Sequence, residues 1–267
     1  MKVLPVASPW IAIDDRITAV PQRPAGPQDA EMMIRKLRVN TRLKEDDVSA
    51  LRRLSVQVRQ IEAGSLIVRE GDHPQYCCFL LDGLACRSKI AETGKRQIVS
   101  FHIPGDMPDL QSLFLETMDH DLTAMSKAKL GFVSHHALLE VAKARWSVAQ
   151  ALWRDTLVDA AVFREWIVNL AARSAPARLA HLMAELRERF AAVGLIAGQQ
   201  FALPITQVDL ADALGLTPVH VNRVIRELRG DGVLDVRRKM VSLNDAAKVA
   251  KMGGFNDRYL HKDQGDT

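Results

Sequence analysis

Residues 205–243 decide the fold, and they read ITQVDLADALGLTPVHVNRVIRELRGDGVLDVRRKMVSL. Thr206 is a good N-cap for a first helix, and Gly215 supplies the positive φ of the tight turn that would end it. Thr217 then caps a second helix, with Pro218 at the first helical position, which proline prefers. Two helices joined by so short a turn predict a helix-turn-helix.

The apolar residues of this stretch give both helices an inner face: Leu210, Leu214, Val221, Val224 or Ile225, and Leu228. The outer face of the second helix would then consist of Val219, His220, Asn222, Arg223 and Arg226. Two β-rich runs at 233–236 and 240–243 flank a basic tip, Arg237-Arg238-Lys239, and predict a β-hairpin wing. The alternative is a plain α-hairpin, but it would require neither long polar side chains on the outer face of the second helix nor a basic wing.

Charge in this region favours a polyanionic partner. Residues 217–241 hold six Lys or Arg against three Asp or Glu, whereas the whole chain is only +4. We expect Arg223 to make a bidentate contact with guanine, and Asn222 to pair with adenine. Contacts with phosphates, which set register without reading sequence, are expected from Thr206, Gln207, Thr217, His220 and the wing.

Upstream of this region, residues 148–172 contain no Pro or Gly and predict one long helix. Its apolar side chains lie on more than one side, so it must be buried on more than one side. Burial inside one chain would explain this, and so would a central helix shared by two copies of the chain. We favour the second explanation and predict these dimer contacts: Leu152, Thr156, Phe163, Trp166, Ile167 and Leu170.

Residues 60–135 have a different texture. Glycines at 64, 71, 83, 94 and 105 separate short β-rich runs, including 66–68, 76–81, 98–101 and 130–133. Strands and turns at this spacing predict an antiparallel jelly-roll barrel. Residues from about 28 to 59 are expected to be helical, and the proline-bearing residues 1–30 to form an irregular extension.

The composition sets further limits. A chain of 267 residues with 48% hydrophobic and 25% charged residues is typical of a globular protein of about two domains. No apolar run is long enough to cross a membrane, and residues 1–10 do not resemble a secretory signal. We therefore expect a cytoplasmic protein without membrane contact, whose three cysteines, Cys77, Cys78 and Cys86, are reduced thiols.

In this order, barrel, long helix and winged helix-turn-helix resemble the Crp/Fnr transcription regulators. The matching runs are 67–72 (IVREGD), 79–83 (FLLDG), 101–106 (FHIPGD) and 210–217 (LADALGLT). The resemblance implies an α+β homodimer that binds a pseudopalindromic site on double-stranded DNA, and it leaves RNA polymerase open as a partner. The predicted segments are an extension (1–30), a cyclic-nucleotide-binding-like jelly-roll sensor domain (31–147), a dimerisation helix (148–174), a winged helix-turn-helix (175–250) and a C-terminal tail (251–267).

Two departures from the family matter. Val219 stands where the family commonly has a glutamate that accepts from cytosine, so a thymine methyl is its expected partner and the usual half-site should not be assumed. Where cyclic-nucleotide-binding members carry a phosphate-binding arginine, two aspartates flank His120. We therefore expect neither cyclic AMP nor an iron–sulfur cluster, which needs four suitably spaced cysteines.

The signal itself stays open. Four alternatives remain. The signal is a metal or haem held by His73, Cys77, Cys78 and His102, or it is thiol oxidation, or it is an unrecognised small ligand, or the protein has no ligand at all. No cofactor or metal site is predicted. An enzyme is not expected, because the chain lacks a His-x-His pair, a glycine-rich phosphate loop and a Gly-x-Ser-x-Gly elbow. A regulatory protein that acts through protein partners instead of DNA is the second hypothesis.

Overall fold

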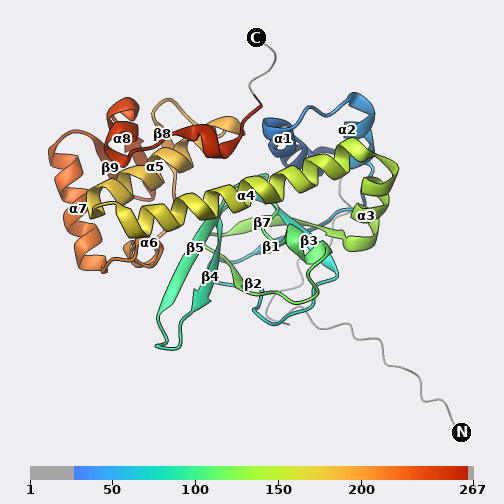
Figure 1. Cartoon of the computed structure of the whole chain (residues 1–267), viewed down its shortest axis with the longest axis horizontal. Coiled ribbons are helices and arrows are strands. Elements are labelled where there is room, and N and C mark those ends of the chain that lie inside the picture. Colours follow the sequence, from blue (N-terminus) through green and yellow to red (C-terminus); the bar gives the residue numbers. More distant parts are fainter. Residues whose placement is uncertain (1–26, 264–267) are drawn as a thin grey trace, which may run out of the picture.

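The N-terminal half is a sandwich of two antiparallel sheets, seen in a computed structural model that describes residues 27–263 (Figure 1). One sheet has the order β1-β7-β3 and the other β2-β6-β4-β5. The strands are β1 (Gln57–Ile61), β2 (Leu66–Val68), β3 (Tyr76–Asp82), β4 (Ala85–Ile90), β5 (Arg96–His102), β6 (Asp121–Ala124) and β7 (Ala128–Ser134). Strand β3 is buried over four consecutive residues because both of its faces lie against core.

Short helices cover the sandwich. They are η1 (Pro27–Ala30), α1 (Glu31–Asn40), α2 (Glu45–Arg52), η2 (Leu110–Leu113) and α3 (His135–Ala144). The expectation of helix from about 28 to 59 is wrong at its end: α2 stops at Arg52, and β1 begins at Gln57. The reason is tertiary, since β1 pairs antiparallel with β7 and fills one edge of the sheet. The predicted extension lies outside the described residues up to residue 26.

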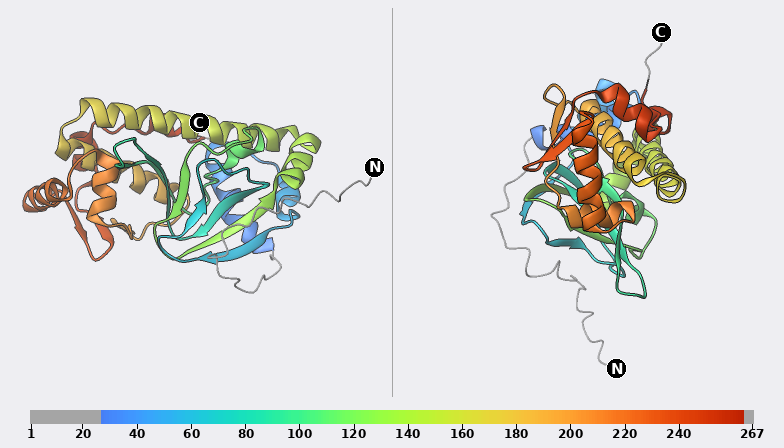
Figure 2. Two further views of the ribbon diagram at one scale, coloured as in Figure 1. Left: turned by 90° about the horizontal axis from the view of Figure 1, so that it is seen from below. Right: turned by 90° about the vertical axis from the view of Figure 1, so that its left-hand side faces the viewer.

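The predicted long helix is α4 (Trp146–Ala172), which begins two residues earlier than expected. At 1.5 Å per residue its 27 residues span about 40 Å. Two perpendicular views show α4 lying along both halves of the molecule, with the sheets beneath one part and the C-terminal helices beside the other (Figures 1 and 2). One helix therefore contacts both halves.

The C-terminal half contains the predicted helix-turn-helix. Its elements are α5 (Ala175–Ala192), β8 (Gln200–Ala202), α6 (Gln207–Leu214), α7 (Pro218–Gly230), β9 (Leu234–Arg237), β10 (Met240–Leu243), α8 (Ala246–Gly253) and η3 (Asp257–Leu260). The wing is a three-stranded sheet of order β8-β10-β9, of which β8 was not predicted.

One hydrophobic core joins the two halves. It runs from Phe101 and Ile103 of the sandwich through Trp166 of α4 into the inner faces of α5, α6 and α7. The rings of Phe101 and Trp166 meet edge to face, with centroids 5.8 Å apart. Because this core is continuous, the C-terminal half is docked on the sandwich and on α4 instead of hanging from a linker.

Candidate DNA-binding surface

Both helices of the helix-turn-helix are capped as the sequence predicts. The Thr206 hydroxyl accepts from the Asp209 amide (3.1 Å), and the Asp209 carboxylate accepts from the Thr206 amide (2.9 Å), which makes a capping box at the start of α6. Gly215 ends α6 with a φ of 63°. The Thr217 hydroxyl accepts from the His220 amide (3.2 Å), so α7 starts with a satisfied cap.

The predicted inner residues are buried, including both Val224 and Ile225. Helix α7 therefore turns the opposite face to solvent, at the end of the molecule away from the sheets (Figure 1). Val219 is 80% exposed, and Arg223 and Arg226 are exposed as well. Within residues 27–263, neither arginine makes a hydrogen bond or an ion pair, so both guanidinium groups are free to meet a partner.

Other predicted contact residues are engaged within the chain. The Asn222 amide donates to the Gln207 side-chain oxygen (3.2 Å), which ties α7 to α6. The Thr206 hydroxyl donates to the Asp209 carboxylate (2.7 Å). His220 is half-buried. To contact DNA, Asn222 and Gln207 would have to break the hydrogen bond between them. Arg223 would only replace its hydrogen bonds to solvent.

The wing ends in a strained turn. Arg237 pairs with Met240 in the β9–β10 register, which leaves Arg238 and Lys239 as the two turn residues, with φ values of 51° and 64°. Two-residue hairpins favour such positive φ values but normally fill them with Asn and Gly. Two long cations thus hold a conformation that costs them of the order of 1 kcal/mol each. All three basic tip residues are exposed, and Arg237 pairs with Asp235 (2.9 Å).

A contact that sequence reasoning missed fixes the helix-turn-helix to the sandwich. Arg96, at the start of β5, donates to the carboxylates of Asp209 and Asp212 on α6 (2.8 Å to Asp212 Oδ2). Gln97 next to it donates to the Asp212 carbonyl oxygen. More than 110 residues separate these partners, and no local pattern announces the pairing. The Asp209 carboxylate, which caps α6, therefore also accepts a hydrogen bond from Arg96 of the sandwich.

The predicted dimer residues differ in how far they are exposed to solvent. Leu152 and Trp166 are each 5% exposed and pack in their own chain's core, and the Trp166 indole donates to Glu185. They cannot lie on a free face, so their assignment to the dimer contact is corrected. Thr156, Phe163 and Leu170 are half-buried, with Phe163 beneath the Arg87 guanidinium, and only Ile167 is well exposed.

A different stripe of α4 is apolar and exposed. Its residues recur at helical spacing and are Trp146, Trp153, Leu157, Ile167 and Val168. Trp153 is 62% exposed and Leu157 55%. Large apolar side chains in one row on an outer helix mark a surface that another protein covers. A helical-wheel projection of the sequence would have shown this row, but not which face of α4 docks on the sandwich.

Comparison with known proteins gives the same two parts. Residues 177–252 match the family model described as a Crp-like helix-turn-helix domain, and residues 58–145 match that of the cyclic nucleotide-binding domain. The chain belongs to the Crp/Fnr family of transcriptional regulators. It is therefore a DNA-binding transcriptional regulator of Crp/Fnr type and not an enzyme, as the sequence predicts.

Individual relatives of this Crp/Fnr chain are bacterial regulators. The transcriptional activator protein FnrL of Cereibacter sphaeroides is 28% identical over 225 residues, which are 83% of this chain and 90% of FnrL. The transcriptional activator protein anr of Pseudomonas aeruginosa is 23% identical over 79% of this chain and 86% of its own length. The solved structure of FixK2 from Bradyrhizobium japonicum has the same fold, with a TM-score of 0.68 at 24% identity over 74% of this chain and 98% of FixK2.

The Crp/Fnr sensor fold raises the question of a cyclic nucleotide, and the interior of this sandwich does not fit one. Arg87, the buried arginine there, donates to Asp159 of α4 and to the Pro108 carbonyl oxygen (2.7 Å). Near the expected phosphate position, Asp119 pairs with His120 (2.7 Å). A cyclic phosphate would meet carboxylates there, and it would have to displace Asp159 from the buried Arg87 guanidinium group.

The cysteines do not fit an iron–sulfur cluster either. Cys77, Cys78 and Cys86 are fully buried and lie in three different hydrophobic clusters, so they cannot share one ligand. Burial raises the pKa of all three thiols, that of Cys86 to about 12. A metal held by His73, Cys77, Cys78 and His102 is also not supported: His73 is exposed and bonds to the Glu116 carbonyl oxygen (2.8 Å), and no group of three metal-binding side chains occurs in residues 27–263.

Membrane insertion of a helix is not indicated. Among the helices between residues 27 and 263, none combines the length and the apolar character needed to cross a bilayer.

Proposed function

We propose that this protein regulates transcription in the cytoplasm as a homodimer that binds a two-fold pseudopalindromic DNA site. One copy of α7 would enter the major groove of each half-site. The observation that carries the proposal is the face of α7: Arg223 and Arg226 are exposed and unpaired within the described chain, beside the exposed Val219. In this proposal residues 31–147 form the sensor domain, residues 148–174 the dimerisation helix and residues 175–250 the winged helix-turn-helix.

Arg223 is the residue to which we assign base recognition. A guanidinium group with no internal partner can donate two parallel hydrogen bonds to O6 and N7 of guanine, which is worth about 1–3 kcal/mol of discrimination. Val219, with no polar atom, would contact a thymine methyl. Thr217 and the wing cations would contact phosphates, which adds affinity but no sequence preference.

The apolar stripe of α4 supports the homodimer. An exposed row that includes Trp153 and Leu157 runs along the helix that contacts both halves of the chain, so two such helices could pack along one two-fold axis. That axis would set the spacing of the two recognition helices, which must match about one turn of DNA, or 34–36 Å. As an activator, the dimer would also contact RNA polymerase; the relatives FnrL and anr are named as activators.

We also propose that the effector is neither cyclic AMP nor an iron–sulfur cluster. The support is the occupied Arg87, the carboxylates near His120 and the distribution of three buried thiols over separate clusters. Several relatives are named anaerobic regulatory proteins, so a signal related to oxygen would have to reach this chain by other chemistry than cysteine ligation.

The deciding experiment is selection of binding sites from random DNA duplexes with the purified full chain. We expect a two-fold symmetric site with a guanine in each half. The Arg223→Ala variant should lose the sequence preference and keep weak, salt-sensitive binding in an electrophoretic shift assay. Recovery of no DNA site at all would favour a regulator that acts through protein partners.

The dimer has its own test. Trp153→Ser combined with Leu157→Ser should convert the dimer to a monomer in light scattering, because buried tryptophans dominate interfaces. Phe114→Ser is the matched control, since Phe114 is 81% exposed on the sandwich and lies off α4. A double variant that stays dimeric at the wild-type concentration would show that the pairing surface is elsewhere.

A further inference from the structure

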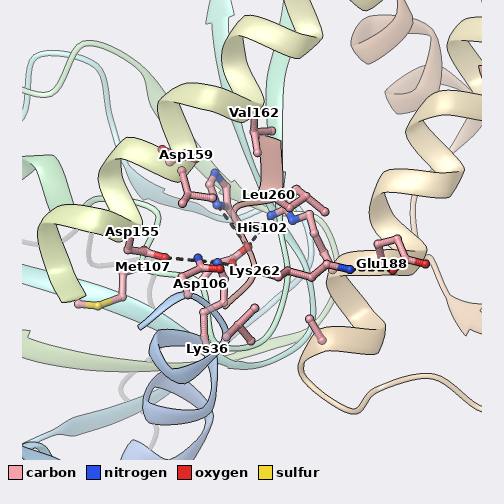
Figure 3. Close-up of a pocket in the computed structure, with 15 residues that line it drawn as sticks. Lys36, His102, Asp106, Met107, Asp155, Asp159, Val162, Glu188, Leu260 and Lys262 are labelled. Atoms are coloured by element: carbon pink, nitrogen blue, oxygen red, sulfur yellow. Dashed lines mark hydrogen bonds and ion pairs between the residues drawn. The ribbon is translucent and has the colours of Figure 1, made fainter. Parts of the chain in front are cut away.

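A cavity of about 50 Å³ lies where α1, α4, α5, the end of β5 and the C-terminal segment meet (Figure 3). Its polar lining consists of Lys36, Asn40, His102, Asp106, Asp155, Asp159, Glu188, Arg189 and Lys262. The lining from α1, α4 and the C-terminal segment falls outside the two stretches that match the family models.

The lining contains a hydrogen-bond acceptor without a donor. Asn40, in the last turn of α1, is only 5% exposed, and its side-chain oxygen has no hydrogen-bond partner among residues 27–263. Leaving such a buried acceptor unpaired costs about 1–3 kcal/mol. A group that donates a hydrogen bond inside the cavity would remove that cost.

Asp155 of α4 is a second under-compensated acceptor. Within the described chain its one ion-pair partner is Lys36 (3.3 Å), and Lys36 lies equally close to Asp106 (3.3 Å). Asp106 and Asp159 each have an arginine of their own, Arg189 and Arg87. Burial, together with the neighbouring carboxylates Asp106 and Asp159, raises the pKa of Asp155.

The cations of the cavity are already occupied. Lys36 is shared by two carboxylates, Arg189 donates to Asp106 (2.7 Å) and to Glu185, and Lys262 donates to Glu188 (3.1 Å) and to Asp257 (2.7 Å). Burial lowers the pKa of His102 to about 4, so this ring adds no charge at neutral pH. An entering anion would find each of these cations already paired with a carboxylate. An entering cation would find the unpaired Asn40 oxygen and the Asp155 carboxylate, which shares its lysine with Asp106.

We propose that this cavity binds the ammonium end of a small primary amine, with Asn40 Oδ1 and the Asp155 carboxylate as its hydrogen-bond acceptors. At roughly 10–15 Å³ per water-sized occupant, the space of about 50 Å³ holds a group of about three to five heavy atoms. An ammonium group carries three donors on a single charged nitrogen, so it can donate to both acceptor groups at once.

The position of the cavity would couple this ligand to the rest of the molecule. Its wall joins α1 of the N-terminal half, α4, and α5 of the C-terminal half. The C-terminal segment closes it, with Leu260 and Lys262 in the lining and the Asp263 amide donating to the Val39 carbonyl oxygen (2.7 Å). A bound amine would hold the two halves in this arrangement; that this controls transcription rests on the proposed function.

Calorimetric titration of the full chain with methylammonium and ethylammonium chloride tests the site. Potassium chloride and tetramethylammonium chloride, which carries the same charge but no N–H, serve as control salts. We expect saturable binding of one primary ammonium ion per chain and none of the control ions. Asp155→Asn and Asn40→Leu should each weaken binding about tenfold or more, the usual worth of a hydrogen bond to a charged group.

Asp46→Asn is the matched control for the charge change, because Asp46 is exposed on α2, and it should bind like the wild type. Equal binding of tetramethylammonium or potassium would overturn the assignment to an amine. So would the absence of saturable binding to the wild-type chain, as would wild-type affinity in both cavity variants. These titrations use no DNA, so a failed amine site leaves the DNA-binding proposal standing, and a failed DNA selection leaves the amine site standing.

Discussion

Replacement of the wing tip by Arg238→Asn and Lys239→Gly should move stability and DNA binding in opposite directions. Both residues occupy the left-handed region, with φ values of 51° and 64°, and Asn-Gly is the pair that such two-residue turns favour. Relief of two positive-φ positions gains of the order of 1 kcal/mol each, and the freer unfolded glycine returns part of it. We expect a net stabilisation of about 1 kcal/mol.

The loss in DNA binding can be worked out from the same two side chains. Each wing loses two exposed cations, and a dimer has two wings, so up to four phosphate contacts disappear. At about 0.9 per contact, the slope of log K against log salt concentration should fall by up to about 3.6. The base preference should stay as it is, because these side chains are assigned to phosphates.

Two assays measure these effects on the same sample. Chemical denaturation gives the free energy of unfolding, and electrophoretic shifts at several salt concentrations give the slope. Lys44→Gln combined with Lys143→Gln is the matched control, because it removes two exposed cations from the N-terminal half. A wing variant that is less stable would refute the argument from backbone strain, and an unchanged slope would show that the tip does not reach phosphates.

Three further predictions concern the interior. Arg96→Ala should destabilise the docking of α6 by about 1–2 kcal/mol, seen as faster hydrogen exchange of α6, since two partly exposed ion pairs are lost. Gly253→Ala should cost more than about 2 kcal/mol in urea denaturation, because the new Cβ would lie 2.4 Å from the His181 backbone nitrogen. The buried groups His102 and Asp109 should make the free energy of unfolding depend on pH in opposite directions between about pH 4 and 6.5. Denaturation of His102→Asn and Asp109→Asn at several pH values measures this.

The sign of each pH effect follows from its pKa. Burial lowers the pKa of His102 to about 4, so on acidification below 6.5 the unfolded chain takes up a proton first and stability falls. Burial raises the pKa of Asp109 to about 7, so the unfolded carboxyl ionises first and stability falls as the pH rises from about 4. Each contribution is of the order of 3 kcal/mol. His102→Asn should therefore lose less stability on acidification than the wild type, and Asp109→Asn less on going to neutral pH.

Controls separate these effects from general damage. Gly230→Ala introduces the same methyl group in α7, where nothing lies within 4 Å, and it should be neutral or slightly stabilising. Arg96→Lys keeps the charge and should retain part of the docking. Wild-type exchange of α6 in Arg96→Ala, or wild-type stability of Gly253→Ala, would contradict the packing described above.

The helix-turn-helix could be predicted because its signals are local. A cap at Thr206, a glycine at 215, and Thr217 with Pro218 specify two helices and a corner within a dozen residues, and the structure has them there. Strand β1 was missed although Val56, Val58 and Ile61 are buried, because the preceding helix was extended to about residue 59. Its pairing partner, β7, lies about 70 residues further along the chain.

The rest of the site could not be predicted, because it depends on pairs distant in sequence. Arg96 meets α6 across more than 110 residues, and Val39 accepts a hydrogen bond from the Asp263 amide across more than 200. The composition of α4 showed that it is buried on more than one side, but only the docked structure shows that Trp166 faces inward and Trp153 outward. Charge pairs and helix orientation of this kind are set by tertiary packing.

The inaccessible cysteines make the molecule easy to label. Cys77, Cys78 and Cys86 are fully shielded from solvent, and their raised pKa values keep them as thiols at neutral pH. Maleimide reagents should therefore not react with them in the native state. One cysteine introduced on the outer face of α7 would then carry a fluorophore or a spin label without any background. In a pair of chains, the distance between two such probes would report the separation of the recognition helices directly, before and after a candidate signal is added.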